Sequence, residues 1–237
     1  MVEGFKLTVQ KLKRILKVSI NLPAGYDQNH EKYPAIITFD GQLLFDFLDE
    51  KTKKMDLAVS ASHSRSIIVG IHSPKIEAWR MSELNPYYNG NDTQVETVLS
   101  LIYFDYIIYE LIPYLKRKYR ISEDIFTMGF NEGAIAAMYL NTHYEIIKGM
   151  GLFNPPLDIV DNKFYEDIES KFDPSKKIYL YKGDKKEGEI SDFYNLYIRL
   201  MALKPLYSKL DYVSDSNNLY DGFEKYIGNC IEFMEEK

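Results

Sequence analysis

Cysteine is almost absent from this sequence of 237 residues, and long apolar runs are missing. The single cysteine, Cys230, cannot form a disulfide within the chain, so no feature indicates an oxidising compartment. No stretch reaches the roughly 18 uncharged apolar residues of a membrane-spanning helix. Residues 1–5 lack the basic start and the apolar run of a signal peptide. We therefore expect a cytoplasmic protein with no membrane partner.

Basic residues are too few to indicate a polyanionic partner. The 29 Lys and Arg residues are outnumbered by 35 Asp and Glu residues, which gives a formal net charge of −6. The basic cluster at residues 11–14 is interrupted by Leu12 and is typical of a solvated strand face. A nucleic-acid partner needs a basic surface, so we expect none. We also expect neither a cofactor nor a metal.

The order of apolar segments predicts one α/β domain over residues 1–237. Continuous or alternating apolar runs predict strands at residues 5–10, 14–22, 33–39, 66–71, 121–128, 147–153, 178–181 and 207–213. Helical spacing predicts helices at residues 43–48, 98–120, 134–143, 190–201 and 219–234, with a kink at Pro113. Strands that alternate with helices form a mostly parallel sheet with helices on both faces.

Residues 72–97 form a polar and aromatic stretch that is rich in turn-forming residues. This is long for a loop without structure of its own, and such loops are often functional. Four of its side chains are candidates for the wall of a pocket, namely Trp79, Arg80, Tyr87 and Tyr88. The alternative is that the aromatic side chains simply pack, and the sequence leaves both interpretations open.

Residues 129–133 read Gly-Phe-Asn-Glu-Gly and lie between a predicted strand and a predicted helix of small residues. In that context, Gly-x-Ser-x-Gly is the nucleophile elbow of a serine hydrolase. Here Asn131 stands where the serine would be. Asparagine tolerates the positive φ of such a turn, and Gly129 and Gly133 allow the strand and the helix to approach closely. The alternative is an ordinary turn between a strand and a helix.

Four further segments accompany the elbow in a recognisable order. They are residues 18–26, which end in Leu-Pro-Ala-Gly-Tyr; 33–42, which begin with Tyr-Pro and end in Asp-Gly-Gln; 79–86, with Arg80 and Glu83; and 110–119, with Pro113. Together these segments resemble the esterase family of the α/β-hydrolase fold, which includes enterochelin esterases, S-formylglutathione hydrolases and tributyrin esterases. The resemblance implies an α/β-hydrolase fold and descent from serine hydrolases.

The chemistry of that family requires a serine, an acid and a histidine, in this chain order. The resemblance places Asn131 at the serine position, Asp184 or Glu187 at the acid position and Tyr220 at the histidine position. No histidine follows His143 in the sequence. Because two of the three groups are absent, we expect a non-catalytic protein that binds a small molecule or a protein partner.

The four histidines leave one rival interpretation. His30 and His63 lie in polar segments, and His143 lies about three turns into the elbow helix. His72 ends a predicted strand on the side of the expected pocket, although a structural role is favoured for it. The rival is an active carboxylesterase in which His72 is the base and the nucleophile is one of three serines, Ser73, Ser82 or Ser214. Adjacent residues at a strand end point to opposite faces, which disfavours the pair with Ser73.

The resemblance also implies two backbone donors that would hold an oxyanion. One comes from Gly41 or Gln42, and the other comes from Glu132. Backbone amides do not depend on side-chain identity, so we expect a site for an anion or a carbonyl group to persist. A third interpretation is a homo-oligomer that uses the tyrosines of residues 98–120, although packing onto the sheet also explains them. These tyrosines are Tyr103, Tyr106, Tyr109 and Tyr114.

Overall fold

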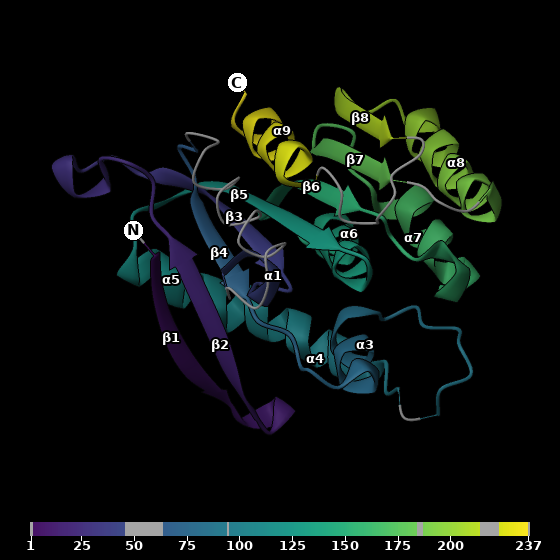
Figure 1. The fold of residues 1–237 in the computed structure, drawn as a ribbon, viewed down its shortest axis with the longest axis horizontal. Coiled ribbons are helices and arrows are strands. Elements are labelled where there is room, and N and C mark those ends of the chain that lie inside the picture. Colours follow the sequence, from purple (N-terminus) through teal and green to yellow (C-terminus); the bar gives the residue numbers. More distant parts are fainter. Residues whose placement is uncertain (1, 46–63, 94, 184–186, 214–222, 237) are drawn as a thin grey trace.

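The computed structural model describes residues 2–45, 64–93, 95–183, 187–213 and 223–236. Its centre is a sheet of eight strands in the spatial order β1-β2-β4-β3-β5-β6-β7-β8 (Figure 1). The strands are β1 Val2–Val9, β2 Arg14–Asn21, β3 Tyr33–Phe39, β4 Ile67–Ile71, β5 Ile121–Phe130, β6 Ile147–Phe153, β7 Lys177–Gly183 and β8 Tyr207–Val213. From β4 to β8 the pairs are parallel, while β2 pairs antiparallel with β1 and β4. The predicted, mostly parallel sheet is confirmed.

Helices cover both faces of this sheet, as predicted (Figure 1). One face packs against α1 Gln42–Phe45 and α9 Phe223–Glu235. The other face packs against α3 Glu77–Leu84, α4 Val98–Tyr106, α5 Ile112–Lys118, α6 Glu132–His143, α7 Asn162–Lys171 and α8 Glu187–Ala202. Each inner strand therefore contributes alternate side chains to two separate apolar clusters.

The helical run at Val98–Lys118 contains a π-helical turn, η3 Ile107–Leu111, between α4 and α5. Pro113 lies in the first turn of α5, and it lacks the N–H that an α-helix would donate to the previous turn. The predicted irregularity therefore begins before the proline. By length and composition this run is apolar enough to cross a membrane, and 50% of its most apolar window is buried. A core helix has the same properties, and Tyr103 and Tyr106 are buried in the core.

The stretch at residues 72–97 is not a structureless loop. It contains α3, and an isolated bridge between Tyr88 and Val160 fastens its second half. The sequence analysis did not predict α3, because the residue before it is Ile76, which makes no side-chain capping bond. A helix that starts without Ser, Thr, Asp or Asn gives little local signal of its beginning.

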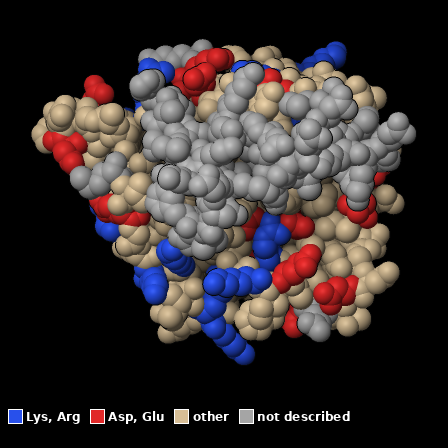
Figure 2. Space-filling model, in the orientation of Figure 1, with Lys and Arg blue, Asp and Glu red and all other residues tan. Residues whose placement is uncertain are grey.

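Charged side chains of both signs are spread over one face of the molecule (Figure 2). Basic side chains gather low on this face, beside the β1–β2 hairpin, and acidic side chains lie to their right (Figure 2). Neither sign covers the face as one continuous patch.

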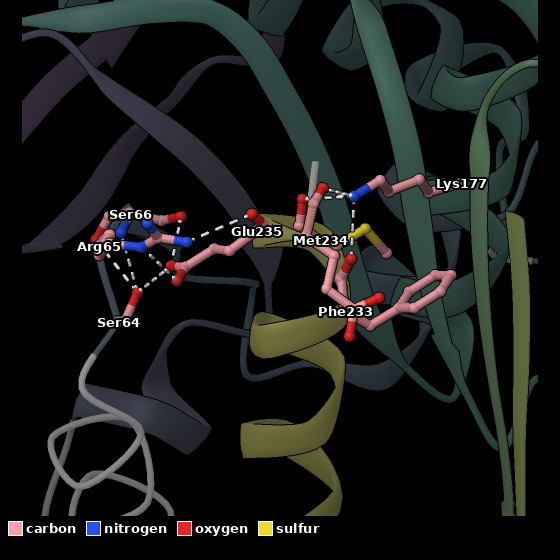
Figure 3. Close-up of polar contacts among 8 residues, drawn as sticks. Ser64, Arg65, Ser66, Lys177, Phe233, Met234 and Glu235 are labelled. Carbon is pink, nitrogen blue, oxygen red and sulfur yellow. Dashed lines mark hydrogen bonds and ion pairs between the residues drawn. The ribbon is translucent and has the colours of Figure 1, made fainter.

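The C-terminal end of α9 lies against the amino end of β7, and Lys177 makes the contact (Figure 3). The Lys177 Nζ donates to the carbonyl oxygens of Phe233 and Met234 at 3.0 and 3.1 Å. In the same turn, the Glu235 carboxylate accepts a hydrogen bond from the Ser66 hydroxyl at 2.7 Å. The last carbonyl groups of a helix lack partners inside the helix, and its dipole favours a cation there. Lys177 therefore caps α9.

Replacing Lys177 with alanine should destabilise the fold, because the carbonyl groups of α9 lose their donor. We expect the free energy of unfolding to fall by about 1.5 kcal/mol, the lower end for hydrogen bonds to a charged group. Urea denaturation measures the change. Lys116→Ala is the control, since Lys116 pairs with the exposed Glu123 and such pairs contribute about 0–1 kcal/mol. Equal losses in the two variants would contradict the capping role.

Candidate functional site

The turn between β5 and α6 has the backbone shape of a nucleophile elbow. Asn131 adopts φ 50° and ψ −122°, so the positive φ predicted from the sequence is confirmed. Its N–H donates to the carbonyl oxygen of Phe153 at 2.9 Å, and its own carbonyl oxygen accepts from the N–H of Ala134 at 2.9 Å. The turn is therefore held on both sides by backbone hydrogen bonds, and a residue with a side chain is kept in a sparsely populated conformation.

Gly129 and Gly133 bring β5 and α6 into close contact, as the sequence predicted. A Cβ atom on Gly129 would lie 1.9 Å from the carbonyl oxygen of Gly133. A Cβ atom on Gly133 would lie 3.0 Å from the Cβ of Phe39 and 3.4 Å from Oδ2 of Asp40. The distance at Gly129 excludes any side chain at that position, whereas the distances at Gly133 are only shorter than usual.

Arg80 on α3 joins the end of β3 to the elbow. Its guanidinium donates to both carboxylate oxygens of Asp40, with Nε and Oδ1 2.9 Å apart, and to the carboxylate of Glu132. Asp40 is 1% exposed, and Glu132 is the first residue of α6. Burial alone would lower the pKa of Arg80, but the hydrogen bonds and negative charges of the two carboxylates raise that pKa above its usual value. Arg80 is therefore a fixed cation between two turns.

The structure narrows the backbone donors predicted for an oxyanion. The N–H of Gly41 donates to the carbonyl oxygen of Ile71 at 2.9 Å, so this N–H is already in use. The side chain of Gln42 is held in place, because its Oε1 accepts from the N–H of Ser73 at 3.0 Å. Gln42 and Glu132 are each the first residue of a helix, where backbone N–H groups lack helical acceptors. A donor pair made by these two residues stays a prediction.

A cleft of about 280 Å³ adjoins the elbow, at the carboxyl ends of β5, β6 and β7. Parallel α/β proteins bind their ligands at this edge of the sheet. Among the described residues, those that line the cleft come from the elbow, from the segment after β6, from the end of β7 and from α8. They are Asn131, Glu132, Asn154, Pro155, Pro156, Leu157, Asp158, Lys182 and Asp192. The sequence predicted only the first two of them, because the others carry no motif.

A larger cleft of about 760 Å³ lies at the opposite edge of the sheet. Residues at or near the amino ends of β3, β5, β6, β7 and β8 line it, together with the end of α9. The amino ends of parallel strands are not where α/β proteins place their chemistry. The smaller cleft beside the elbow is therefore the candidate site, despite its size.

Two predicted triad positions, Asp184 and Tyr220, lie outside the described residues. Glu187 begins α8, but its side chain is likewise outside the description. His63 is outside it too, and His30 is exposed. Within the described ranges, no three His, Cys, Asp or Glu side chains gather as a metal site requires.

His143 lies at the far end of α6 from the elbow and belongs to a separate polar cluster. Its ring stacks on Tyr139, with the ring centroids 3.8 Å apart, and its Nε2 lies 3.2 Å from the carboxylate of Asp167. The same carboxylate accepts a hydrogen bond from the hydroxyl of Tyr87 at 2.9 Å. Tyr87 is therefore a packed core residue. This decides between the two interpretations of its side chain, as part of a pocket wall or as simple packing.

His72 does not line the cleft beside Asn131, although the sequence placed it on the pocket side. Its Nε2 lies 2.8 Å from the Oγ of Ser19, a partner that the sequence analysis did not consider. Ser19 pairs with Gly70 in the antiparallel register of β2 and β4, and His72 follows two residues later on the same face. Ser19 is 5% exposed and His72 is 6% exposed, so this serine–histidine contact is buried.

The remaining candidates lie away from the cleft. Trp79 is 59% exposed and does not line it, and Arg80 reaches the site only through Asp40 and Glu132. The Ser82 hydroxyl donates to the carbonyl oxygen of Ala78 at 2.7 Å inside α3. Ser214, the third serine of the rival interpretation, is outside the described residues.

Comparison with known proteins identifies the same architecture. A family model described as "Putative esterase" matches residues 9–187, which is more than half of the chain. No curated protein matches the sequence. The BES protein from Bacillus cereus is similar in structure, with a TM-score of 0.79 and 16% identity over 100% of this chain and 96% of that one.

Two further solved structures are similar. An IroE-like serine hydrolase from Shewanella oneidensis has a TM-score of 0.75 and 18% identity over 99% of this chain and 79% of that one. A siderophore hydrolase, EstA, from Aspergillus nidulans has a TM-score of 0.71 and 11% identity over 98% of this chain and 93% of that one. At such identities the likeness shows a shared fold.

The two elbow glycines should differ in their tolerance of alanine. Gly129→Ala places a Cβ atom inside the Gly133 carbonyl, so we expect a loss of about 3 kcal/mol or more, or no folded protein. Gly133→Ala meets contacts of 3.0 and 3.4 Å and should cost no more than about 1–2 kcal/mol. Thermal and urea denaturation compare the two. If both variants were equally stable, the described approach of β5 and α6 would be wrong.

Glu83 should make stability depend on pH. Burial raises the pKa of Glu83 to about 7, against the charge and the hydrogen bond of Arg14, whereas the ordinary value is 4.5. Between these values the folded protein holds a proton that the unfolded chain has lost. Stability is therefore full below pH 4.5 and falls as the pH rises through 7, by on the order of 3 kcal/mol.

The measurement is the difference in pH dependence between the wild type and Glu83→Gln, followed by urea denaturation. The glutamine cannot ionise, so its profile should lack this fall. Glu123→Gln, which neutralises an exposed acid, is the control and should keep the wild-type profile. A wild-type profile that rises between pH 5 and pH 7 relative to Glu83→Gln would show that Arg14 outweighs burial.

Proposed function

The chain belongs to this esterase family, and we propose that it is a member that binds a small molecule without serine-hydrolase activity. The observation that carries the proposal is the side chain at the elbow. Asn131 has the backbone conformation from which a nucleophile would project, and it lines the adjoining cleft. Its amide offers a donor and an acceptor for hydrogen bonds, but it has no hydroxyl or thiol that could attack an acyl group.

The chemistry of acyl transfer supports the proposal. A serine hydrolase needs an oxygen nucleophile and an imidazole that accepts its proton. In this sequence the nucleophile position is an amide, and no histidine follows His143. Loss of the nucleophile or of the histidine alone lowers turnover by about 10⁶-fold in a serine protease, and the losses are not additive. What remains of such a site is its capacity to bind.

The arrangement around Arg80 also favours binding over catalysis. Asp40 and Glu132 both engage its guanidinium, so this cation is already committed to two carboxylates beside the elbow. The Glu132 carboxylate is thereby held at the first turn of α6, where the helix dipole favours it. The network keeps the elbow and the end of β3 in place, so the cleft keeps its shape in the absence of a nucleophile.

A second candidate function is an esterase whose nucleophile is Ser19 and whose base is His72. The specific observation in its favour is the distance of 2.8 Å between the Ser19 Oγ and the His72 Nε2, which is hydrogen-bond reach for a nucleophile and its base. Both residues are buried, and neither lines either of the two clefts described above. A nucleophile must meet its substrate, so we rank this candidate second.

The test is the hydrolysis of p-nitrophenyl acetate and p-nitrophenyl butyrate, together with labelling by a fluorophosphonate probe. We expect rates no higher than those of the heat-denatured protein, and no labelled serine. Asn131→Ser restores a hydroxyl but supplies no imidazole, so it should raise turnover by less than about 10-fold.

Two outcomes would contradict the proposal. Turnover that is lost in Asn131→Ala would mean that the elbow itself is catalytic. Turnover or labelling that survives in Asn131→Ala and is lost in Ser19→Ala would establish the second candidate. Ser122→Ala, at the amino end of β5, is the matched control for removal of a serine.

A further inference from the structure

The polar groups of the cleft beside Asn131 specify a class of ligand. We propose that the cleft binds a small primary amine that carries a carboxylate or a carbonyl group at its other end, such as an ω-amino acid or its amide. This inference rests on the proposed function, because it assigns a ligand to the same cleft. One end of the cleft offers hydrogen-bond donors, and the described residues of its lining carry more negative than positive charge.

Asn154 provides a donor whose partner is missing. This residue follows β6, is 6% exposed and lines the cleft. Its side-chain oxygen accepts from the N–H of Gly183 at 2.9 Å, which fixes the orientation of the amide. Within the described part of the chain, its Nδ2 is buried and has no hydrogen-bond partner. Buried donors without an acceptor are rare in native proteins, and an oxygen atom of a ligand in the cleft would satisfy this one.

The first turn of α6 adds donors at the same end. Asn131 is the residue that caps this 12-residue helix, and its side chain makes no capping hydrogen bond. The N–H groups of a first helical turn lack helical acceptors, and the dipole gives this end of the helix a partial positive charge. Asn131 and Glu132 line the same cleft as Asn154, so the first turn of α6 and Asn154 lie at one site. A carboxylate or carbonyl oxygen fits this environment.

The charges of the lining favour a cation on the ligand as well. Among the described residues of the lining there are three carboxylates, from Glu132, Asp158 and Asp192, and one ammonium, from Lys182. Glu132 shares the guanidinium of Arg80 with Asp40, so this group contributes two negative charges and one positive charge. Asp158 and Asp192 are both exposed and are free to meet solvent or a ligand. A simple anion would be repelled by this excess, whereas an ammonium group would be attracted.

The volume of the cleft sets the size of the ligand. About 280 Å³ is at the lower end for small-molecule sites, and Pro155, Pro156 and Leu157 supply an apolar wall. A short aliphatic chain between the amine and the oxygen group fits such a wall. The ligand class is therefore a compact molecule with a charge or dipole at each end.

Isothermal titration calorimetry of the full chain with three probes of matched length tests the proposal. The probes are 5-aminopentanoate, pentylamine and pentanoate. We expect 5-aminopentanoate to bind at least about 10-fold more tightly than either of the others, because only it engages both sets of groups. Equal affinities for 5-aminopentanoate and pentylamine would overturn the role of the donors. Tighter binding of pentanoate, or no saturable binding of any probe, would overturn the assignment.

Isosteric variants test which residues of the cleft bind the oxygen end and the amine end of the ligand. Asn154→Asp keeps an oxygen for the Gly183 N–H but removes the unpartnered donor. It should weaken 5-aminopentanoate about 10-fold and leave pentylamine unchanged or tighter. The double variant Asp158→Asn and Asp192→Asn alters only exposed residues, so it should fold, and it should weaken both amines. Glu123→Gln, an exposed acid outside the cleft, is the control. If the double variant bound both amines like the wild type, the charge argument would fail.

The probes contain no ester, so this experiment is independent of turnover. Amine binding could fail while the protein remains without hydrolase activity, and only the ligand class would then be wrong. Hydrolase activity found with unchanged amine binding would instead overturn the proposed function alone.

Discussion

The geometry of the candidate site depends on one half-buried cation. Arg80 comes from α3, and it binds Asp40 at the end of β3 and Glu132 at the start of α6. Asp40 has φ 57° and Asn131 has φ 50°, so the turns on either side of the guanidinium both use a conformation that residues with side chains rarely adopt. Removing one partner from such a network leaves an uncompensated buried charge, which is strongly destabilising. The ion pairs therefore hold two strained turns in register and keep the adjoining cleft open.

The backbone shape of the elbow does not depend on the side chain of residue 131. Its conformation follows from the closeness of β5 and α6 at Gly129 and from backbone hydrogen bonds, none of which involves the side chain of residue 131. An amide side chain can therefore occupy this position without a change of fold. This is the physical reason that one fold carries several functions, and that membership of the esterase family does not by itself specify a reaction.

The contact between Ser19 and His72 could not be predicted from the sequence, because it depends on which strands are neighbours in the sheet. Ser19 and His72 are 53 residues apart, and they meet because β2 pairs antiparallel with β4. The strand pairing could not be read from the apolar pattern, which predicts where strands lie but not which strands are neighbours. Helix α3 was missed for a local reason instead, since Ile76 gives no capping signal at its start.

The sequence by itself determined the alternation of strands and helices, the mostly parallel sheet and the Gly-x-Asn-x-Gly turn with its positive φ. These features depend on residue type and on spacing over a few positions, which local physics controls. Only the tertiary structure decided that Arg80 binds Asp40 and Glu132, which lie 40 and 52 positions from it in the sequence. The same holds for the hydrogen bond that the Gly41 N–H donates to Ile71, and for the cleft that Asn154 and Asn131 both line. Such meetings depend on the order of strands in the sheet, because this order decides which strand ends become neighbours.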